Sequence, residues 1–141
     1  MKALKTLKGL IKHRFGLIDP LTKLGSKLAF DLSEPTGWII YTDANGLKEL
    51  NDTYGHDVGD AFLKSIGELY QSLNANAFRV GGDEFLLIAK TEAEANKAID
   101  SIHNSKLSIA CGLAKITTLP EAIKKAESKM YKDKARIKGK A

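Results

Sequence analysis

The sequence is poor in cysteine, in proline and in long apolar runs. One cysteine and three prolines occur among 141 residues. A single cysteine excludes an intramolecular disulfide framework and leaves too few thiols for a zinc site built on cysteines, so Cys111 is predicted to be a small buried apolar residue. The longest apolar runs, at 38–41 and 85–89, are far shorter than the roughly 18 residues that indicate a membrane span. We therefore expect no transmembrane helix.

The first segment also lacks the unbroken apolar stretch of a secretory signal, because a lysine interrupts its apolar residues every three or four positions. We therefore expect a cytoplasmic protein. Leu4, Leu7 and Ile11 fall at helical spacing with lysines opposite them, which predicts a short basic amphipathic helix over residues 1–17. Such a helix suits peripheral contact with an anionic membrane.

The net charge of +5 conceals an uneven distribution along the chain. Residues 1–14 hold five basic and no acidic side chains, and residues 124–141 hold eight basic and two acidic ones. The centre, 15–123, has nine basic against fifteen acidic residues. Basic ends suit a nucleic acid, an anionic membrane or a polyphosphate ligand, whereas an acidic centre suits a hard cation. Nucleic acid is not expected as a partner, because the ends lack interleaved aromatic residues and a recognisable binding motif.

The order of the predicted elements indicates a single α+β domain over residues 18–141. Apolar patterns and turn residues predict four strands, at 38–42, 77–80, 85–89 and 107–114. They predict helices that open at Asp19, near Leu47, at Asp60, after Thr91 and after Thr118. The second and third strands are separated by Gly-Gly-Asp-Glu, which indicates a hairpin. We therefore expect a central, mostly antiparallel sheet flanked by helices.

Acidic residues gather at two places that this fold would bring together. Asp43 ends the first strand, and Asp83 and Glu84 lie at the tip of the hairpin. Two carboxylates about 4 Å apart repel by roughly 4 kcal/mol at an effective dielectric constant of about 20, so either one stays protonated or a cation neutralises them. Oxygen ligands suit Mg²⁺, and Mg²⁺ beside lysines suits a nucleoside triphosphate.

Three separated motifs together resemble one known family. They are FRVGGDEF, the earlier YTDANGLKELNDTYGHDVGD and the later AESKMYKDK. In this order they resemble the GGDEF family, the diguanylate cyclases that join two GTP molecules into cyclic di-GMP. The resemblance runs from Asp19 to Lys138, about 85% of the chain. It implies that residues 18–141 form one catalytic domain whose fold is similar to that of nucleotide cyclases and polymerase palms.

The resemblance implies a metal site and a reaction centre. It assigns metal binding to Asp43, to the Ala44 carbonyl and to Asp83, with Glu84 beside them. It implies two Mg²⁺ ions per site, with Mn²⁺ as an alternative, and it assigns the catalytic parts to Asp83, Glu84 and Lys48. Asp83 would also help to deprotonate the attacking hydroxyl.

The resemblance also implies how GTP is bound. It assigns the guanine edge to Asn51 and Asp60, and the triphosphate to Lys48 and Lys134. Lys138 stands where the family usually has an arginine, and Arg136 is the substitute that the sequence offers. The remaining substrate-binding positions are the two hairpin glycines, where a side chain would clash with the nucleotide: Gly81 and Gly82.

Because each domain holds one GTP, the resemblance implies a homodimer with facing sites. The alternative is a non-catalytic GTP-binding regulatory module of the same fold, although such modules typically lose the acids kept here. Asn45 departs from the family pattern, where many members have a second aspartate. Among the histidines, His56 is predicted to form local hydrogen bonds, and His13 and His103 have no companions in sequence that would make them ligands.

Overall fold

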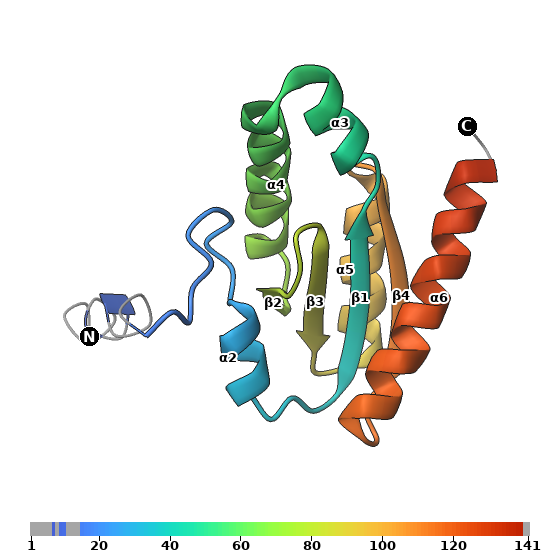
Figure 1. Ribbon diagram of the computed structural model, residues 1–141. Helices are drawn as coiled ribbons and strands as arrows, with labels where there is room; N and C mark the ends of the chain where they lie inside the picture. The colour runs from blue at the N-terminus through green and yellow to red at the C-terminus, as the bar shows by residue number, and fades with distance from the viewer. Residues whose placement is uncertain (1–6, 8, 11–14, 140–141) are drawn as a thin grey trace.

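The computed structural model describes residues 7, 9, 10 and 15–139, and its centre is a four-stranded antiparallel sheet (Figure 1). The strand order is β2-β3-β1-β4. The strands are β1 (Trp38–Ala44), β2 (Asn76–Arg79), β3 (Glu84–Ala89) and β4 (Ile109–Lys115). The predicted α+β class and antiparallel sheet are confirmed. The basic helix predicted over residues 1–17 lies largely outside the described residues.

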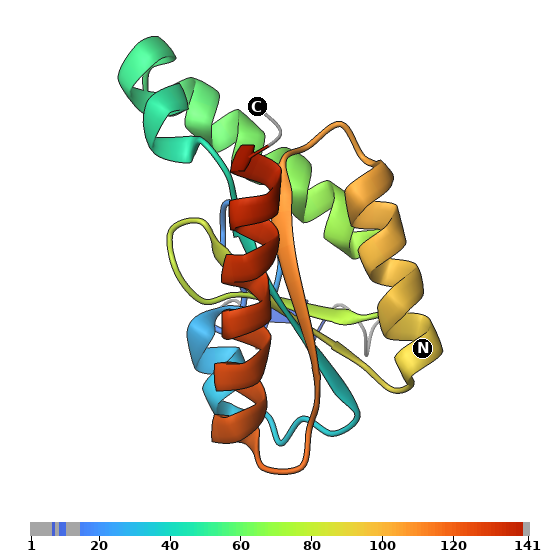
Figure 2. The ribbon, with the colours of Figure 1, turned by 90° about the vertical axis from the view of Figure 1, so that its right-hand side faces the viewer.

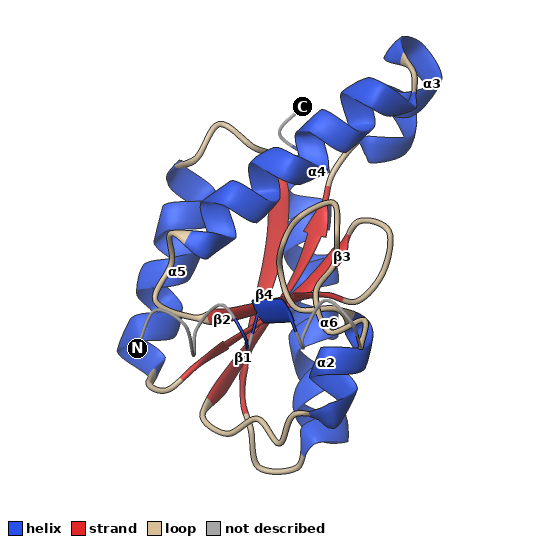
Figure 3. Ribbon diagram, turned by 90° about the vertical axis from the view of Figure 1, so that its left-hand side faces the viewer, coloured by secondary structure: helices blue, strands red, loops and turns tan. Residues whose placement is uncertain are grey.

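Helices cover both faces of the sheet. They are α2 (Lys27–Leu32), α3 (Leu47–Tyr54), α4 (His56–Gln71), α5 (Glu92–Asn104) and α6 (Leu119–Gly139). Helices α4 and α5 pack on one face, and α2 and α6 pack on the other (Figure 2 and Figure 3). Among the helices that the structure describes, none is long and apolar enough to cross a membrane.

The alternation of side chains along β1 distributes its residues between two hydrophobic cores. Ile40 belongs to the core under α4 and α5, whereas Ile39 and Tyr41 belong to the core under α2 and α6. Asp43 follows Ile39 and Tyr41 at intervals of two residues, so its side chain points to the same face of the sheet, the one that α6 covers. This orientation explains why a lysine of α6, and not one of α4, reaches the carboxylate.

The helix predicted to open at Asp19 begins instead at Lys27. Asp19 closes a tight turn, because its Oδ2 accepts hydrogen bonds from the Thr22 amide at 2.9 Å and from the Thr22 hydroxyl at 2.7 Å. Lys23 then takes a positive φ of 65°, which no helix accommodates. Ser26 caps the helix by accepting from the Ala29 amide. The helix start predicted from the Asp-Pro pair is therefore wrong, since a turn closed by an aspartate side chain and a helix N-cap use the same residues.

The longest helix, α6, packs directly on the backbone of β4 at Gly112. A Cβ added at Gly112 would collide with the Ala126 carbonyl oxygen and the Met130 nitrogen. Both of these atoms belong to the helix backbone, which cannot rotate away as a side chain can. The absence of a side chain at this position therefore fixes how closely α6 approaches the sheet.

We expect Gly112→Ala to lower the free energy of unfolding by about 1–3 kcal/mol, because the added methyl group overpacks a rigid contact. Urea denaturation of the two proteins measures the difference. The matched control is Gly139→Ala, where an added Cβ meets no atom within 4 Å. Equal denaturation midpoints for Gly112→Ala and the parent protein would show that α6 is free to move away from β4.

Candidate active site

Strand pairing brings the predicted acidic residues together. Asp43 of β1 lies directly opposite Glu84 of β3 in the antiparallel register. The neighbouring Ala44 amide donates a hydrogen bond of 3.0 Å to the Asp83 carbonyl, which fixes the hairpin loop against the end of β1. One carboxylate oxygen from each of Asp43, Asp83 and Glu84 lies within 4.8 Å of the other two. The predicted cluster of the three acidic side chains is therefore present at the C-terminal end of β1.

The environment of Asp43 disfavours its charged form. Only 5% of the residue is exposed, and no described residue donates a hydrogen bond to its buried Oδ1. Burial raises the pKa of Asp43, and the nearby Asp83 raises it further. Lys134 opposes this shift in part, since its Nζ lies 3.5 Å from Asp43 Oδ2. A buried carboxylate oxygen without a donor, beside two more carboxylates, fits a divalent cation bound through oxygen.

Tyr41 holds the third carboxylate of the cluster in place. Its hydroxyl donates a hydrogen bond of 2.8 Å to Glu84 Oε2. Burial raises the pKa of Tyr41, and the interaction with Glu84 raises it further, so the hydroxyl keeps the proton that it donates. Sequence analysis gave Tyr41 no part in the site. The one indication in the sequence was that Tyr41 and Asp43 are two residues apart on a strand, which places both side chains on the same face of the sheet.

Arg79 fixes the shape of the hairpin loop. Its Nη2 and Nε donate to the Gly82 carbonyl at 2.9 and 3.2 Å. Its Nη1 lies 3.3 Å from Asp19 Oδ1. Burial alone would raise the pKa of Asp19, but hydrogen bonds from Thr22 and the Arg79 charge outweigh it and lower that pKa. The Asp19 turn and the glycine loop are thus joined through one guanidinium group, which no local sequence pattern could indicate.

A shallow pocket of about 300 Å³ lies between α3 and the hairpin loop. It joins four of the residues to which the sequence assigned substrate or metal binding, namely Lys48, Asn51, Gly82 and Asp83. The other residues that line it are Leu47, Asp52 and His56. His56, expected to make only local hydrogen bonds, therefore faces the pocket, and the sequence gave no signal for Asp52.

Three further residues predicted to bind substrate do not line this pocket, namely Gly81, Asp60 and Lys138. Gly81, which precedes Gly82 in the hairpin loop, is half-buried, and a Cβ added there would lie 3.3 Å from the Glu84 side chain. Asp60 lies outside the pocket, exposed on α4, and Lys138 is exposed in the last turn of α6. The C-terminal end of α6 and the C-terminal end of β1, which carries Asp43, lie toward the same end of the molecule (Figure 1).

Gly59 positions Asn51. A Cβ at Gly59 would overlap the Asn51 side chain. The glycine therefore leaves space for the side-chain amide of Asn51 between α3 and the first turn of α4. Among the described residues, none donates to the buried Asn51 Oδ1. A buried amide oxygen without a partner costs roughly 1–3 kcal/mol, which makes it a candidate for contact with a bound ligand. The sequence gave Gly59 no role of its own.

Two side chains, Arg136 of α6 and His103 of α5, both contact Asp133. Arg136, the substitute offered for the missing arginine, donates from Nη2 at 2.7 Å and from Nε at 3.0 Å to Asp133 Oδ1. It is therefore held by a neighbouring acid and not by the acidic cluster. His103, which sequence analysis left without companions, lies 3.2 Å from Asp133 Oδ2 through its Nε2.

Comparison with known families agrees with this geometry. The family described as diguanylate cyclase, GGDEF domain, matches residues 17–140. The chain therefore belongs to the GGDEF diguanylate cyclase family. The predicted resemblance is confirmed.

Individual relatives resemble the chain in sequence, and a solved structure shares its fold. The diguanylate cyclase DgcS of Shewanella oneidensis is 32% identical over 147 residues, covering 84% of this chain and 50% of the relative. DgcN of Escherichia coli is 30% identical over 105 residues, covering 63% of this chain and 26% of the relative. The chain thus spans half or less of these relatives. The GGDEF domain of DgcB from Caulobacter crescentus, solved in complex with c-di-GMP, shares the fold with a TM-score of 0.75 at 19% identity, covering 84% of this chain and 90% of that one.

We expect Asp43→Asn to raise the stability of the protein at pH 7 when no divalent cation is added. The pKa of Asp43 is higher in the folded chain than its ordinary value of 3.8. The folded state therefore holds the proton more tightly than the unfolded state, and stability falls as the pH rises from that ordinary value through the raised one. The neutral amide carries no such cost.

Urea denaturation between pH 4 and pH 8 measures this effect. The advantage of Asp43→Asn should be largest at neutral pH and should disappear near the ordinary pKa of 3.8. Asp100→Asn, which replaces an exposed aspartate on α5, is the matched control and should show no comparable gain. An Asp43→Asn advantage that stays constant with pH would contradict the electrostatic explanation.

Proposed function

We propose that this chain is an active diguanylate cyclase, which condenses two GTP molecules into cyclic di-GMP and releases two pyrophosphates. The observation that carries the proposal is the cluster of Asp43, Asp83 and Glu84, in which the buried Asp43 has an unpartnered carboxylate oxygen. The cluster lies next to a pocket lined by Lys48 and Asn51. The family membership supports the same reaction.

The residues present fit a divalent cation. Asp43, Asp83 and Glu84 offer hard oxygen ligands, and the Ala44 carbonyl lies at the same end of β1. We propose two Mg²⁺ ions per site, with Mn²⁺ as an alternative. When bound, such ions lower the pKa of a hydroxyl and neutralise charge on a phosphate.

The side chains of the pocket supply the binding and orientation of GTP. Lys48 lines the pocket, Lys134 reaches the acidic cluster, and Lys138 lies further along α6; in the proposal these three hold the triphosphate. Asn51 and Asp60 recognise the guanine edge, because acceptor oxygens match the N1 and N2 hydrogens that adenine lacks. Gly81 and Gly82 leave room for the nucleotide beside the hairpin backbone.

The chemical step joins the two nucleotides through a phosphodiester bond. The 3′-oxygen of one GTP bonds to the α-phosphorus of the other, the bond between the α- and β-phosphates breaks, and pyrophosphate leaves with its electron pair. In the proposal Asp83 accepts the proton of the 3′-hydroxyl, and Glu84, held by Tyr41, remains in a fixed position beside it. A second such step closes the ring.

The proposed reaction needs two copies of the domain. One pocket beside one acidic cluster holds a single GTP, so the two reacting nucleotides come from facing sites in a homodimer. The alternative of a non-catalytic GTP-binding module is less well supported. The family resemblance implies that such modules typically lose the acids that this chain keeps as Asp43, Asp83 and Glu84.

Asp83→Ala should abolish cyclic di-GMP formation, to less than about 1% of the parent rate, because it removes both a metal ligand and the proton acceptor. The half-buried loop position contributes little to packing, so the circular dichroism spectrum should match that of the parent. The urea midpoint should be no lower than that of the parent, because the substitution also removes a charge that repels Asp43. Product formed from GTP and Mg²⁺ is measured by chromatography over a range of protein concentrations.

Two comparisons make this experiment decisive. Glu68→Ala, which replaces an exposed glutamate of α4, should retain the parent rate. The rate per molecule of the parent should rise with protein concentration, since only the dimer is active. Parent protein that binds GTP but makes no product at any concentration would refute the cyclase and favour the regulatory module.

Gly59→Ala should raise the KM for GTP about as much as Asn51→Ala does, because the new methyl group displaces the Asn51 side chain from the pocket. It should do so without loss of stability, since alanine favours a helix over glycine by about 1 kcal/mol. Steady-state kinetics of both variants and of the double variant measures this. If the two substitutions raise KM additively on a logarithmic scale, Gly59 does not act through Asn51.

A further inference from the structure

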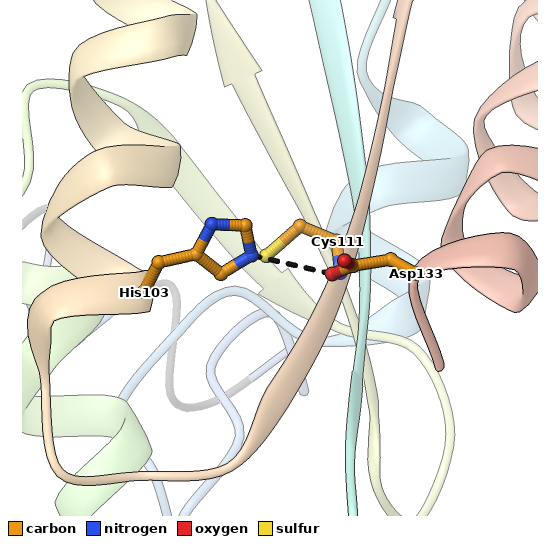
Figure 4. Close-up of side chains that lie close together, drawn as sticks. All are labelled: His103, Cys111 and Asp133. Carbon is orange, nitrogen blue, oxygen red and sulfur yellow. Dashed lines mark hydrogen bonds and ion pairs between the residues drawn. The ribbon is translucent and has the colours of Figure 1, made fainter. Parts of the chain in front are cut away.

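Three side chains from three elements converge at the edge strand of the sheet (Figure 4). His103 comes from the last turn of α5, Cys111 from β4 and Asp133 from α6. The His103 ring nitrogen, the Cys111 sulfur and an Asp133 carboxylate oxygen all lie within 4.8 Å of one another. None of these residues belongs to the acidic cluster at the end of β1.

The carboxylate in this group is held from two sides. Asp133 Oδ2 accepts the Cys111 backbone amide at 2.9 Å, which satisfies an N–H group on the open side of the edge strand. Asp133 Oδ1 accepts two hydrogen bonds from Arg136. These contacts and the charge of His103 outweigh burial and lower the pKa of Asp133. The carboxylate is therefore ionised and oriented before any ligand arrives, as is usual around metal ligands.

We propose that His103 Nε2, Cys111 Sγ and Asp133 Oδ2 form a binding site for a borderline-soft divalent cation, with Zn²⁺ as the best match. Imidazole, thiolate and carboxylate are the three ligand types that Zn²⁺ takes in proteins. Two such N and O ligands on one tetrahedral ion lie about 3.4 Å apart. The observed distance between His103 Nε2 and Asp133 Oδ2 is 3.2 Å.

Charge and access also favour a divalent ion here. Burial, followed by the neighbouring Asp133, raises the pKa of the Cys111 thiol to about 12. An ion that binds here displaces the thiol proton and the proton on His103 Nε2, both of which leave to solvent, and its two positive charges balance the thiolate and the carboxylate. The raised thiol pKa makes this binding weaker at low pH than at high pH. His103 is partly exposed and borders a hollow of about 390 Å³, so its imidazole is accessible to an ion from solvent. The Arg136 charge on the far oxygen of Asp133 limits the affinity.

The ligand set distinguishes this site from the acidic cluster. Nitrogen and sulfur ligands discriminate against Mg²⁺, which prefers oxygen, so the two sites select different metals. Sequence analysis missed the group because its members are separated by 7 and 21 residues between α5, β4 and α6. Only the packing of α5 and α6 beside the same strand brings them together.

Cobalt(II) is the probe that tests the proposal, because a Co²⁺–thiolate bond gives a charge-transfer band in the near ultraviolet and because Cys111 is the only cysteine of the chain. The reduced protein is titrated with Co²⁺ in excess Mg²⁺, which competes at the acidic cluster. We expect the thiolate band to saturate at one Co²⁺ per chain and to disappear when Zn²⁺ is added. Activity is not measured, so the result does not depend on the proposed cyclase.

Substitutions decide which side chains bind the ion. His103→Ala changes an exposed side chain and should weaken Co²⁺ binding more than about tenfold, and Asp133→Asn should weaken it similarly. His56→Ala, the matched control at the other pocket, should leave the band unchanged. A parent protein without a thiolate band would overturn the proposal, and so would a band that survives in both His103→Ala and Asp133→Asn. Cys111 would then be only a buried apolar residue, and Asp133 would serve only to accept the backbone N–H of the edge strand.

Discussion

The antiparallel pairing of β1 with β3 determines where every acidic group of the site lies. This register places Asp43 opposite Glu84, and the hairpin that joins β2 to β3 then returns Asp83 beside Ala44. A slip of one residue would turn Asp43 toward α4 and would move it away from Lys134. The apolar residues of β1 prevent such a slip, because Ile39 and Ile40 are each fully buried in a different core. The hydrophobic pattern of one strand thus fixes the geometry of a charged site.

Much of the fold follows from local patterns that the sequence displays. Alternating or continuous apolar residues located the four strands, and the short turn indicated that β2 pairs with β3. The pairing of this hairpin with β1 was assumed in predicting the acidic cluster, and the structure shows it. The start of α2 did not follow, because Asp19 with Thr22 satisfies a turn as well as a helix cap. The acidic cluster was predictable since its members end strands that become neighbours. Arg79, Tyr41 and Gly59 were not, because each acts through a contact with an element distant in sequence or through a neighbour's side chain.

The family resemblance supplied roles that local physics could not. Nothing in composition or spacing assigns a base to Asn51. The structure adds only that its amide oxygen is buried against Gly59 and that no described residue donates a hydrogen bond to it. The structure adds what holds Arg136, the substitute that the sequence offers for the missing arginine, because its guanidinium donates to Asp133. The family pattern therefore supplies the roles proposed for the ligand-binding residues, whereas the coordinates identify the residues that hold those side chains in place.

Helix α6 connects the two clusters of charged residues. Consecutive residues of a helix point about 100° apart, so Asp133 faces the edge of β4 while Lys134 reaches Asp43 on the face of the sheet. Gly112 allows the helix backbone to contact the strand directly, which leaves α6 little freedom to tilt. The same rigid element thus carries Asp133 and Lys134. Because the Lys134 charge partly offsets the cost of ionising Asp43, the close packing of α6 on β4 also fixes part of the charge balance of the acidic cluster.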